Sequence, residues 1–483
     1  MAKTLLLSQI RWGVALLVPV LLCGRLDAQI PPIEITSIPA YGSQENLRGR
    51  VSNVDPGTYH VAAYLFLEGL GWYVKPTLAS PCTSIAGNGE FVVDVTTGGV
   101  DNLAHRYAVF LLPASDPCPL ANGVPFLPDE LLDQPSDLVE RTPFTLQFSG
   151  YTWVQRNSPY PGGPESNCFS PEHAFVDGQG QFHLTLASSS CGGEVWLARS
   201  LGYGEYRIHT IGRIDDLDPQ AVFGLFTWDP DAKPSQREMD IELSRWGVPG
   251  DPLNAQFVLQ PFGQSGNRDR FPITLTDGAS ELTFLMLWEP GMVTFSVYHG
   301  HHFGAPPPSD LIHEKVFTSG VPEPGRERFR FNLWRFCGSS CTLTQDQETV
   351  VTHFSHVPIP LDLHTVTPCR MVDTRLATSR FGGPALVAGT TRLFRVTGAC
   401  PIPPTARAVS LNITVTQPDT GGNLLVYPAA FGAPLTSSIN YSAGQTRSNN
   451  AILAVGDFEH LAVRCAQAAG NVHLIVDVNG YFE

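Results

Sequence analysis

Three acidic residues, Glu238, Asp240 and Glu242, alternate with apolar residues in the segment REMDIEL (237–243). On a β-strand, alternate side chains point to the same face, so the three carboxylates would project together while the apolar residues pack into a core. Retaining hydrolysis of a glycosidic bond needs one carboxylate as nucleophile and one carboxylic acid as proton donor, roughly 5–5.5 Å apart. The Cα atoms of Glu238 and Glu242 would lie about 13 Å apart on a strand, and side chains that lean toward each other could close most of that gap. We call these three residues the acidic triplet.

Spacing alone leaves three interpretations of the acidic triplet open. It could be a catalytic set, an edge strand with alternating acids in solvent, or part of a calcium site. In the catalytic interpretation the charge of Asp240 can raise the pKa of a neighbouring glutamate, which would keep an acid protonated near neutral pH. The elements around the triplet are needed to choose among the three.

The elements that would position the triplet are β-strands. Helical periodicity is nearly absent, and short alternating runs are separated by Gly, Pro, Asn and Asp, which indicates an all-β chain. The strongest helix candidate, DELLDQPSDLVE (129–140), is interrupted by Pro135. Pro-rich stretches at 113–130 and 357–368 predict domain boundaries. We therefore expect an N-terminal domain over 34–142, a middle domain over 143–357 large enough for a two-sheet sandwich, and a C-terminal domain over 367–483.

The segment E-M-D-I-E resembles the E-x-D-x-E signature of glycoside hydrolase family 16. Five further segments resemble family features and occur in the family's order: GYGEYRIHTIGRID (202–215), AVFGLFTW (221–228), LTFLMLWEPGMVTFSVYHG (282–300), FNLW (331–334) and ETVVTHFSHVP (348–358). The resemblance covers roughly 150–357. It implies a two-sheet jelly roll with a cleft across its concave sheet, and retaining hydrolysis of β-linked polysaccharides. The implied roles are nucleophile for Glu238, helper acid for Asp240 and acid/base for Glu242.

The sequence also departs from the family pattern in two places. The hairpin turn Tyr298-His299-Gly300 lacks the usual Asp, and the segment 234–237 before the signature lacks a Trp often found there, although Trp246 follows soon after. These departures bear on the substrate class more than on the reaction.

Aromatic and amide side chains near the triplet are candidates for sugar binding, because indole offers a broad surface on which an apolar sugar face can stack. We predict that Trp334, Trp228 and Trp246 stack on sugar rings and that Asn332, two residues before Trp334, hydrogen-bonds a sugar hydroxyl. Trp288 lies in an alternating strand and is expected in the core.

The flanking segments carry no chemistry that the sequence identifies. Segment 34–142 resembles an immunoglobulin-like module that precedes such catalytic domains in exported bacterial proteins. Segment 367–483 resembles a C-terminal β module of secreted bacterial proteins. Either could bind polysaccharide or a cell-wall or surface glycan, or act as a spacer.

The first 28 residues are expected to be a signal peptide, with basic Lys3 and Arg11, an apolar run over 13–22 and the small residue Ala28 at the cleavage site. No later stretch is long and apolar enough to span a membrane. With 30 basic and 45 acidic residues the net charge is −15, and no basic stripe is present to bind nucleic acid.

The ten cysteines fit an exported protein. After removal of Cys23 they group within separate segments, as disulfides internal to domains would: Cys82/Cys118, Cys168/Cys191, Cys337/Cys341 and Cys369/Cys400/Cys465. One thiol of the last three is left over, and Cys465 is the expected one.

The sequence therefore predicts a secreted, multidomain, all-β retaining endo-glycosidase that cleaves internal bonds of a glucan or galactan. The alternatives are a non-catalytic lectin-like binder on the same sandwich and a transglycosylase that uses the same residues. No cofactor is required by this chemistry. The acids Asp215, Asp216, Asp218, Asp229 and Asp231 could hold a structural calcium ion, although solvated loops are the expected state.

Overall fold

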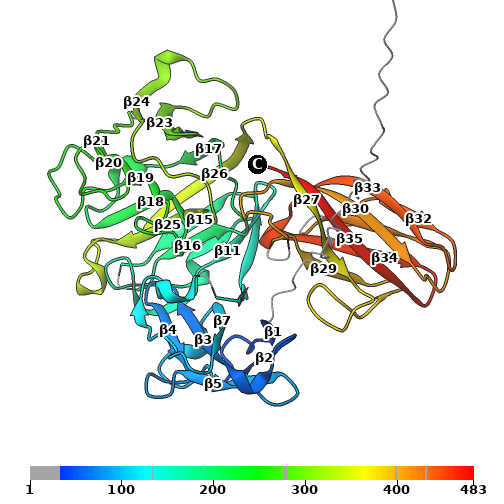
Figure 1. Cartoon of the computed structure of the whole chain (residues 1–483). Coiled ribbons are helices and arrows are strands. Elements are labelled where there is room, and N and C mark those ends of the chain that lie inside the picture. Colours follow the sequence, from blue (N-terminus) through cyan, green and yellow to red (C-terminus); the bar gives the residue numbers. More distant parts are fainter. Residues whose placement is uncertain (1–32, 133, 189, 277–279, 398–399, 430–431) are drawn as a thin grey trace, which may run out of the picture.

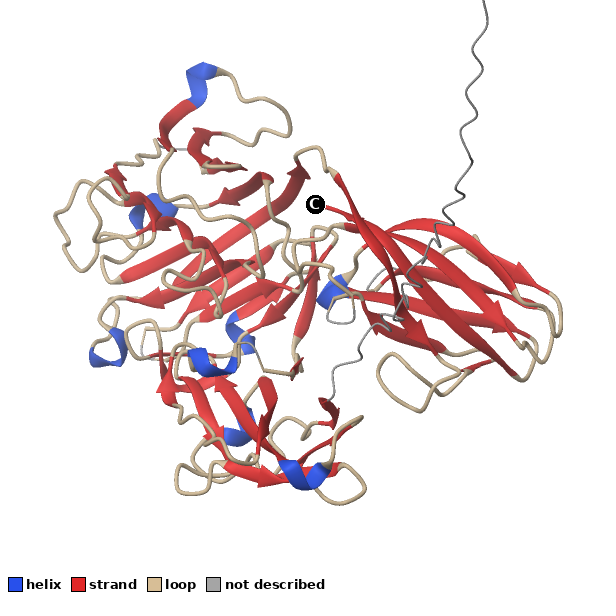
Figure 2. Ribbon diagram, in the orientation of Figure 1, coloured by secondary structure: helices blue, strands red, loops and turns tan. Residues whose placement is uncertain are grey.

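The computed structural model describes residues 33–132, 134–188, 190–276, 280–397, 400–429 and 432–483, and within them the chain is all-β (Figure 2). The described helices are single 3-10 turns: η1 (Pro56–Thr58), η2 (Asp101–Leu103), η3 (Asp129–Leu131), η4 (Pro171–His173), η5 (Ile214–Asp216), η6 (Pro308–Asp310), η7 (Gly338–Ser340) and η8 (Asp457–Glu459). The helix candidate over 129–140 is η3 followed by a strand, because Pro135 interrupts it. The expected signal peptide over 1–28 lies outside the described residues.

The N-terminal strands form two sheets that enclose their own core. One sheet has the order β1 (Ile33–Ser37), β2 (Leu47–Val51), β6 (Glu90–Val93). The other has the order β8 (Asn122–Val124), β4 (Gly71–Lys75), β3 (Tyr59–Leu67), β7 (Arg106–Pro113), β9 (Ser136–Glu140), with β5 (Cys82–Ser84) paired to β3. In chain order this is the A-B-E and C′-C-F-G arrangement of an immunoglobulin-like sandwich.

The middle strands form a larger sandwich, as the sequence predicts. Its first sheet has the order β10 (Thr145–Phe148), β11 (Tyr151–Gln155), β16 (Gly193–Leu197), β25 (Arg328–Arg335), β18 (Ala221–Trp228), β19 (Met239–Leu243), β20 (Ala255–Leu259), β21 (Arg268–Phe271). Its second sheet has the order β14 (Ala174–Val176), β15 (Phe182–Leu186), β26 (Gln347–Pro358), β17 (Gly204–Ile211), β22 (Glu281–Glu289), β23 (Met292–His299), β24 (Leu311–Phe317). A hairpin of β12 (Ser158–Gly162) and β13 (Asn167–Phe169) lies outside both sheets.

The two large sheets pack face to face over one hydrophobic core. Trp153, Phe331 and Phe354 from both sheets stack or meet edge to face there. Trp288 is fully buried in the same core, as expected from its alternating strand. The outer face of the eight-stranded sheet is therefore free to carry polar side chains.

The C-terminal strands form a third sandwich beside the middle one (Figure 1). One sheet has the order β27 (Leu363–Asp373), β35 (Asn471–Phe482), β30 (Ala408–Thr416), β33 (Arg447–Ala454), with β28 (Leu386–Val387) paired to β35. The other has the order β29 (Thr391–Arg395), β34 (His460–Gln467), β31 (Gly422–Pro428), β32 (Ile439–Tyr441). Among the described residues, no helix is long and apolar enough to cross a membrane.

Four disulfides join the cysteines in the predicted groups. They are Cys82–Cys118, Cys168–Cys191, Cys337–Cys341 and Cys369–Cys400. Cys465 is a buried free thiol, which confirms it as the unpaired member of the last group.

Candidate active site

The acidic triplet lies on one face of the eight-stranded sheet. Asp240 and Glu242 belong to β19, and Glu238 directly precedes its first residue. The intervening apolar residues Met239, Ile241 and Leu243 are buried in the sandwich core. As the sequence predicts, the carboxylates lie on one face of the strand and the alternating apolar side chains lie on the core face.

A row of directly opposed residues runs across the sheet from the triplet. Glu242 pairs with Gly224 of β18, Gly224 pairs with Asn332 of β25, and Asn332 pairs with Glu194 of β16. A Cβ atom at position 224 would lie 2.5 Å from Asn332 Oδ1. The missing side chain at Gly224 therefore leaves room for the Asn332 amide beside the triplet.

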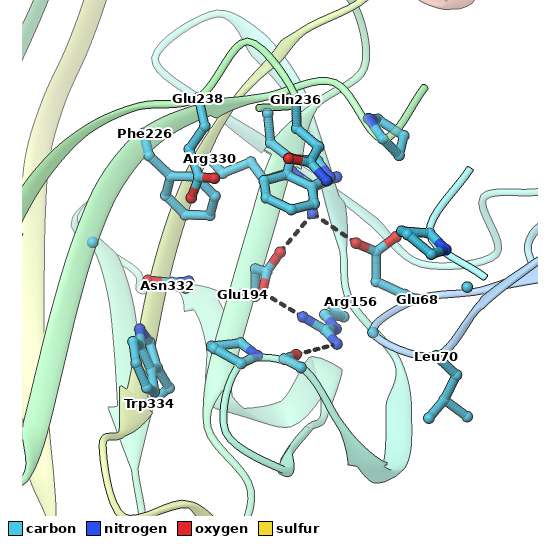
Figure 3. Close-up of a pocket in the computed structure, with 18 of the residues that line it drawn as sticks. Glu68, Leu70, Arg156, Glu194, Phe226, Gln236, Glu238, Arg330, Asn332 and Trp334 are labelled. Atoms are coloured by element: carbon cyan, nitrogen blue, oxygen red, sulfur yellow. Dashed lines mark hydrogen bonds and ion pairs between the residues drawn. The ribbon is translucent and has the colours of Figure 1, made fainter. Parts of the chain in front are cut away.

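A cavity of about 410 Å³ lies over this face (Figure 3). That volume falls within the roughly 300–1,000 Å³ of typical small-molecule sites. Residues of the middle domain that line it are Arg156, Gly163, Pro164, Glu194, Gly224, Phe226, Trp228, Pro230, Gln236, Glu238, Asp240, Glu242, Arg330, Asn332 and Trp334. Residues of the N-terminal domain that line it are Phe66, Glu68, Gly69, Leu70, Gly71, Gly123 and Pro125.

The triplet carboxyl groups have raised pKa values. Burial, followed by repulsion from Glu242, raises the pKa of Glu238 to about 8. Burial and repulsion from both glutamates raise the pKa of Asp240 well above its usual range. Burial raises the pKa of Glu242 to about 7, so burial and not the expected repulsion from Asp240 is its main cause. At neutral pH the triplet therefore retains protons.

Hydrogen bonds fix the positions of the triplet carboxyls. Gln256 of β20 donates to Glu242 Oε2 at 2.7 Å, and Gln260 donates to Asp240 Oδ2 at 3.3 Å. A hydrogen bond between Asp240 and Glu238 lowers the pKa of Glu238 and raises that of Asp240, so the two carboxyl groups share a proton.

A second group of charges occupies the other side of the cavity, and we call it the arginine–glutamate network. Arg330 binds Glu194 at 2.6 Å and Glu68 at 3.1 Å, while Arg156 binds Glu194 at 2.8 Å. All four side chains are buried. The positive charge of Arg330 also lowers the pKa of Glu238, although burial outweighs it.

Three of the four residues predicted to bind sugar line the cavity. They are Trp228, Asn332 and Trp334. The buried Trp228 Nε1 and Asn332 Oδ1 have no hydrogen-bond partner among the described residues, so each brings an unused hydrogen-bonding group to the lining of the cavity. Trp246 is not among the lining residues; its ring meets Trp334 edge-on, with 6.3 Å between the centroids.

Of the five acids considered for calcium, three are buried and not solvated as expected, whereas Asp216 and Asp231 are exposed. Asp215, Asp218 and Asp229 are buried, with exposed fractions of 6%, 8% and 1%. Asp215 pairs with Arg213, Asp218 accepts from Thr344, and Asp229 pairs with Arg237. For these three acids the expectation was wrong, because it did not anticipate the cationic and hydroxyl partners that Arg213, Arg237 and Thr344 supply.

Sequence reasoning missed the network and the glutamines. Arg330 precedes Asn332 and Trp334 at the same alternating spacing in RFRFNLWR (328–335), so its place on the cavity face could have been predicted. Glu194 lies in a strand of otherwise small and apolar residues, GEVWL (193–197), which is a signal for a buried charge with a partner. Glu68 carries no comparable signal, because its role depends on the packing of two domains.

No protein-family model matches the chain, and no curated protein matches it. Among solved structures it is similar to the β-glucanase of Bacillus licheniformis, with 18% identity over 45% of this chain and 97% of that chain and a TM-score of 0.35. It is similar to a β-1,3-1,4-glucanase (lichenase) from a mouse hindgut metagenome, with 15% identity over 45% of this chain and 99% of that chain and a TM-score of 0.34. It is also similar to an immunostimulatory antigen and pseudo β-1,3-glucanase of Mycobacterium tuberculosis, with 18% identity over 42% of this chain and 89% of that chain and a TM-score of 0.32. Each similarity spans less than half of this chain.

Proposed function

We propose that this protein is a retaining glycoside hydrolase that acts on a β-linked polysaccharide outside the cell. The observation that carries the proposal is the acidic triplet itself. Three carboxyl groups share one face of a strand and line a cavity, and their pKa values are raised, chiefly by burial. Such an arrangement costs stability, and perturbed carboxyls in a cavity are typical of catalytic sites.

In the proposed reaction Glu238 is the nucleophile. The positive charge of Arg330 and the hydrogen bond from Asp240 both favour its ionised form. Its carboxylate attacks the anomeric carbon and forms a glycosyl ester, while the bond from that carbon to the leaving oxygen breaks. Asp240 keeps its proton and holds the nucleophile in place.

Glu242 is the proposed acid and base. In the first step it gives its proton to the leaving oxygen, and in the second it takes a proton from the water that cleaves the ester. A pKa of about 7 suits both duties near neutral pH. The proposed reaction requires a charge on Glu238 and protons on Asp240 and Glu242.

The polar groups without partners would bind the substrate. Trp228 Nε1 can donate to a sugar hydroxyl and Asn332 Oδ1 can accept from one. The Trp334 ring lines the same cavity and offers a stacking surface. Four disulfides fit an oxidising compartment, in agreement with the proposed export.

The test is a screen of the purified protein on β-linked glucans and galactans, with new reducing ends as the readout. Wild type should release them, and Glu238→Gln should lose turnover by several orders of magnitude while it still binds the polymer. Glu314→Gln, an exposed position on β24 of the other sheet, is the matched control.

Three other outcomes would change the proposal. Binding without reducing ends would favour a lectin-like protein. Longer chains formed at the expense of shorter ones would favour a transglycosylase. Full activity in Glu238→Gln would remove this residue from the mechanism.

A further inference from the structure

The N-terminal domain forms one wall of the cavity that holds the acidic triplet. The turn between β3 and β4 (residues 68–70), the first residue of β4, Gly71, and the residues Gly123 and Pro125 at the end of β8 line the cavity together with the triplet. In Figure 3, Glu68 and Leu70 lie on the opposite side of Glu194 and Arg156 from Glu238. The cavity thus extends from the triplet to a wall that belongs to another domain.

The wall lies across the direction in which a bound chain would run. The triplet is on β19, and the row through β18 and β25 to Glu194 on β16 crosses three inter-strand spacings. At about 4.8 Å per spacing, the distance is roughly 14 Å. Glu68 binds Arg330 of β25, and Gly69 contacts the segment beside Arg156, so the wall closes the β16 side.

A close backbone contact joins the tip of this wall to the middle domain. Gly163 N donates to Gly69 O at 3.0 Å. A Cβ atom at Gly69 would lie 2.5 Å from Gly163 N and 2.6 Å from Arg156 Nη2. Gly69 also has a φ of +77°, so the turn depends on glycine at this point. At this point no room remains for a polysaccharide chain between the two domains.

The wall is fixed and is not a mobile lid. Tyr160 of the middle domain packs into the core of the N-terminal domain. Arg106 pairs with Asp231, and Lys233 pairs with Asp129 at 2.5 Å. The buried pair between Arg330 and Glu68 adds a contact inside the cavity. Opening the wall would expose Tyr160 and the buried charges of Arg106, Arg330 and Glu68.

We propose that this wall makes the protein an end-acting enzyme. The chain end of the polysaccharide abuts Leu70 and the arginine–glutamate network, and cleavage at the triplet releases a short oligosaccharide of uniform length. This inference rests on the proposed glycosidase function and revises the sequence prediction of internal cleavage. Arg330 Nε is buried without a partner among the residues that the structure describes, and it would donate to a hydroxyl at the chain end.

The first experiment follows viscosity, reducing ends and product length together, with the full chain acting on the polysaccharide that it cleaves best. We expect reducing ends to accumulate while viscosity stays close to its starting value, with one short oligosaccharide dominant from the earliest time. An early loss of viscosity with a broad ladder of products would overturn the end-acting inference and leave the proposed hydrolase intact. A complete absence of reducing ends would instead overturn the proposed function.

The second experiment fills the end of the cavity. Leu70→Trp should shorten the dominant product or raise the KM severalfold, because the larger side chain occupies space that the chain end needs. Leu78→Trp, at a position of the same domain with 48% exposure and outside the cavity lining, is the matched control and should act like wild type. Unchanged products and KM in a folded Leu70→Trp protein would overturn the inference.

Discussion

The acidic triplet and the arginine–glutamate network lie in the same cavity and differ in their neighbours. The four side chains of the network are buried, whereas in the triplet Asp240 is buried and Glu238 and Glu242 are half-buried. The pKa of Glu68 is held well below its usual range, because the attraction of Arg330 and contact with His105 outweigh burial. The pKa values of the triplet are raised, because burial outweighs the weaker influence of any cation.

This difference separates two uses of a buried carboxylate. A paired carboxylate keeps its charge and holds strands and domains together, but it has little reactivity left. A carboxylate without a close cation exchanges protons near neutral pH, which is what proton transfer to a substrate requires. Within one cavity, the carboxylates paired with Arg156 and Arg330 therefore stabilise the structure, whereas the acidic triplet remains able to exchange protons.

The largest expected effect separates the roles within the triplet. Glu238→Ala and Glu242→Ala should each lose several orders of magnitude in turnover. Added azide should then restore product from an activated substrate in both, because a small anion can occupy the vacated space. The glycosyl azide should have inverted configuration from Glu238→Ala and retained configuration from Glu242→Ala. The same configuration from both variants would contradict the assigned roles.

The next effect tests the network as a scaffold. Arg330→Met leaves Glu68 and Glu194 buried without their main partner, so the free energy of unfolding should fall by about 3–5 kcal/mol. Arg370→Met is the matched control, because Arg370 is 46% exposed and its pair with Asp477 should contribute about 0–1 kcal/mol. Denaturant unfolding measures both, and equal losses would show that Arg330 has no special structural role.

Opposite pH dependences of stability follow from the same comparison. The pKa of Glu242 is about 7 in the folded protein, against an ordinary value of 4.5. Its contribution to the free energy of unfolding is therefore fully present below pH 4.5 and is lost as the pH rises through 7. Glu242→Gln should remove this decline, which amounts to at most roughly 3 kcal/mol. The pKa of Glu68 is lowered, so its contribution is present above pH 4.5 and is lost in acid. Glu68→Gln should therefore change stability only at acidic pH. Urea unfolding of both variants across this pH range measures the effect, and the same dependence of stability on pH in both would contradict the prediction.

The smallest effect concerns the tuning of the acid. Gln256→Leu removes the hydrogen bond that lowers the pKa of Glu242, so the alkaline limb of the pH–rate profile should move to higher pH. A hydrogen bond to a charged group contributes about 1.5–3 kcal/mol, which corresponds to a shift of about one to two pH units. Gln147→Leu, which loses an exposed hydrogen bond to Thr152 on β11, is the control. If the alkaline limb stays at the same pH in Gln256→Leu, ionisation of Glu242 does not determine that limb.

Local pattern predicted the reactive part of the site well. The alternation in REMDIEL placed three carboxylates on one face and their neighbours in the core, because strand geometry determines both. Trp228, Asn332 and Trp334 follow the same rule on β18 and β25. The cysteine groups also predicted the disulfides, because the partners are close in sequence.

The parts that sequence reasoning missed depend on contacts between distant segments. Glu68 reaches the cavity only because one sandwich packs on another, and no periodicity encodes that contact. The prediction that Asp240 would raise the pKa of Glu242 treated the strand as isolated, whereas the raised value comes from burial beneath surrounding elements. Trp246 is close in sequence to the triplet, but its ring packs beside Trp334.

The ion pair between Glu68 and Arg330 has a consequence for the order of folding, because the two residues are 262 positions apart. During synthesis the N-terminal sandwich emerges first, and its Glu68 then lacks the cation that neutralises it. That cation arrives with β25, the strand that lies between β16 and β18 in the eight-stranded sheet. Insertion of this one strand therefore completes the sheet and neutralises Glu68 together, and contacts of such long range form slowly. The first domain to be made thus reaches its final state only when the second has closed.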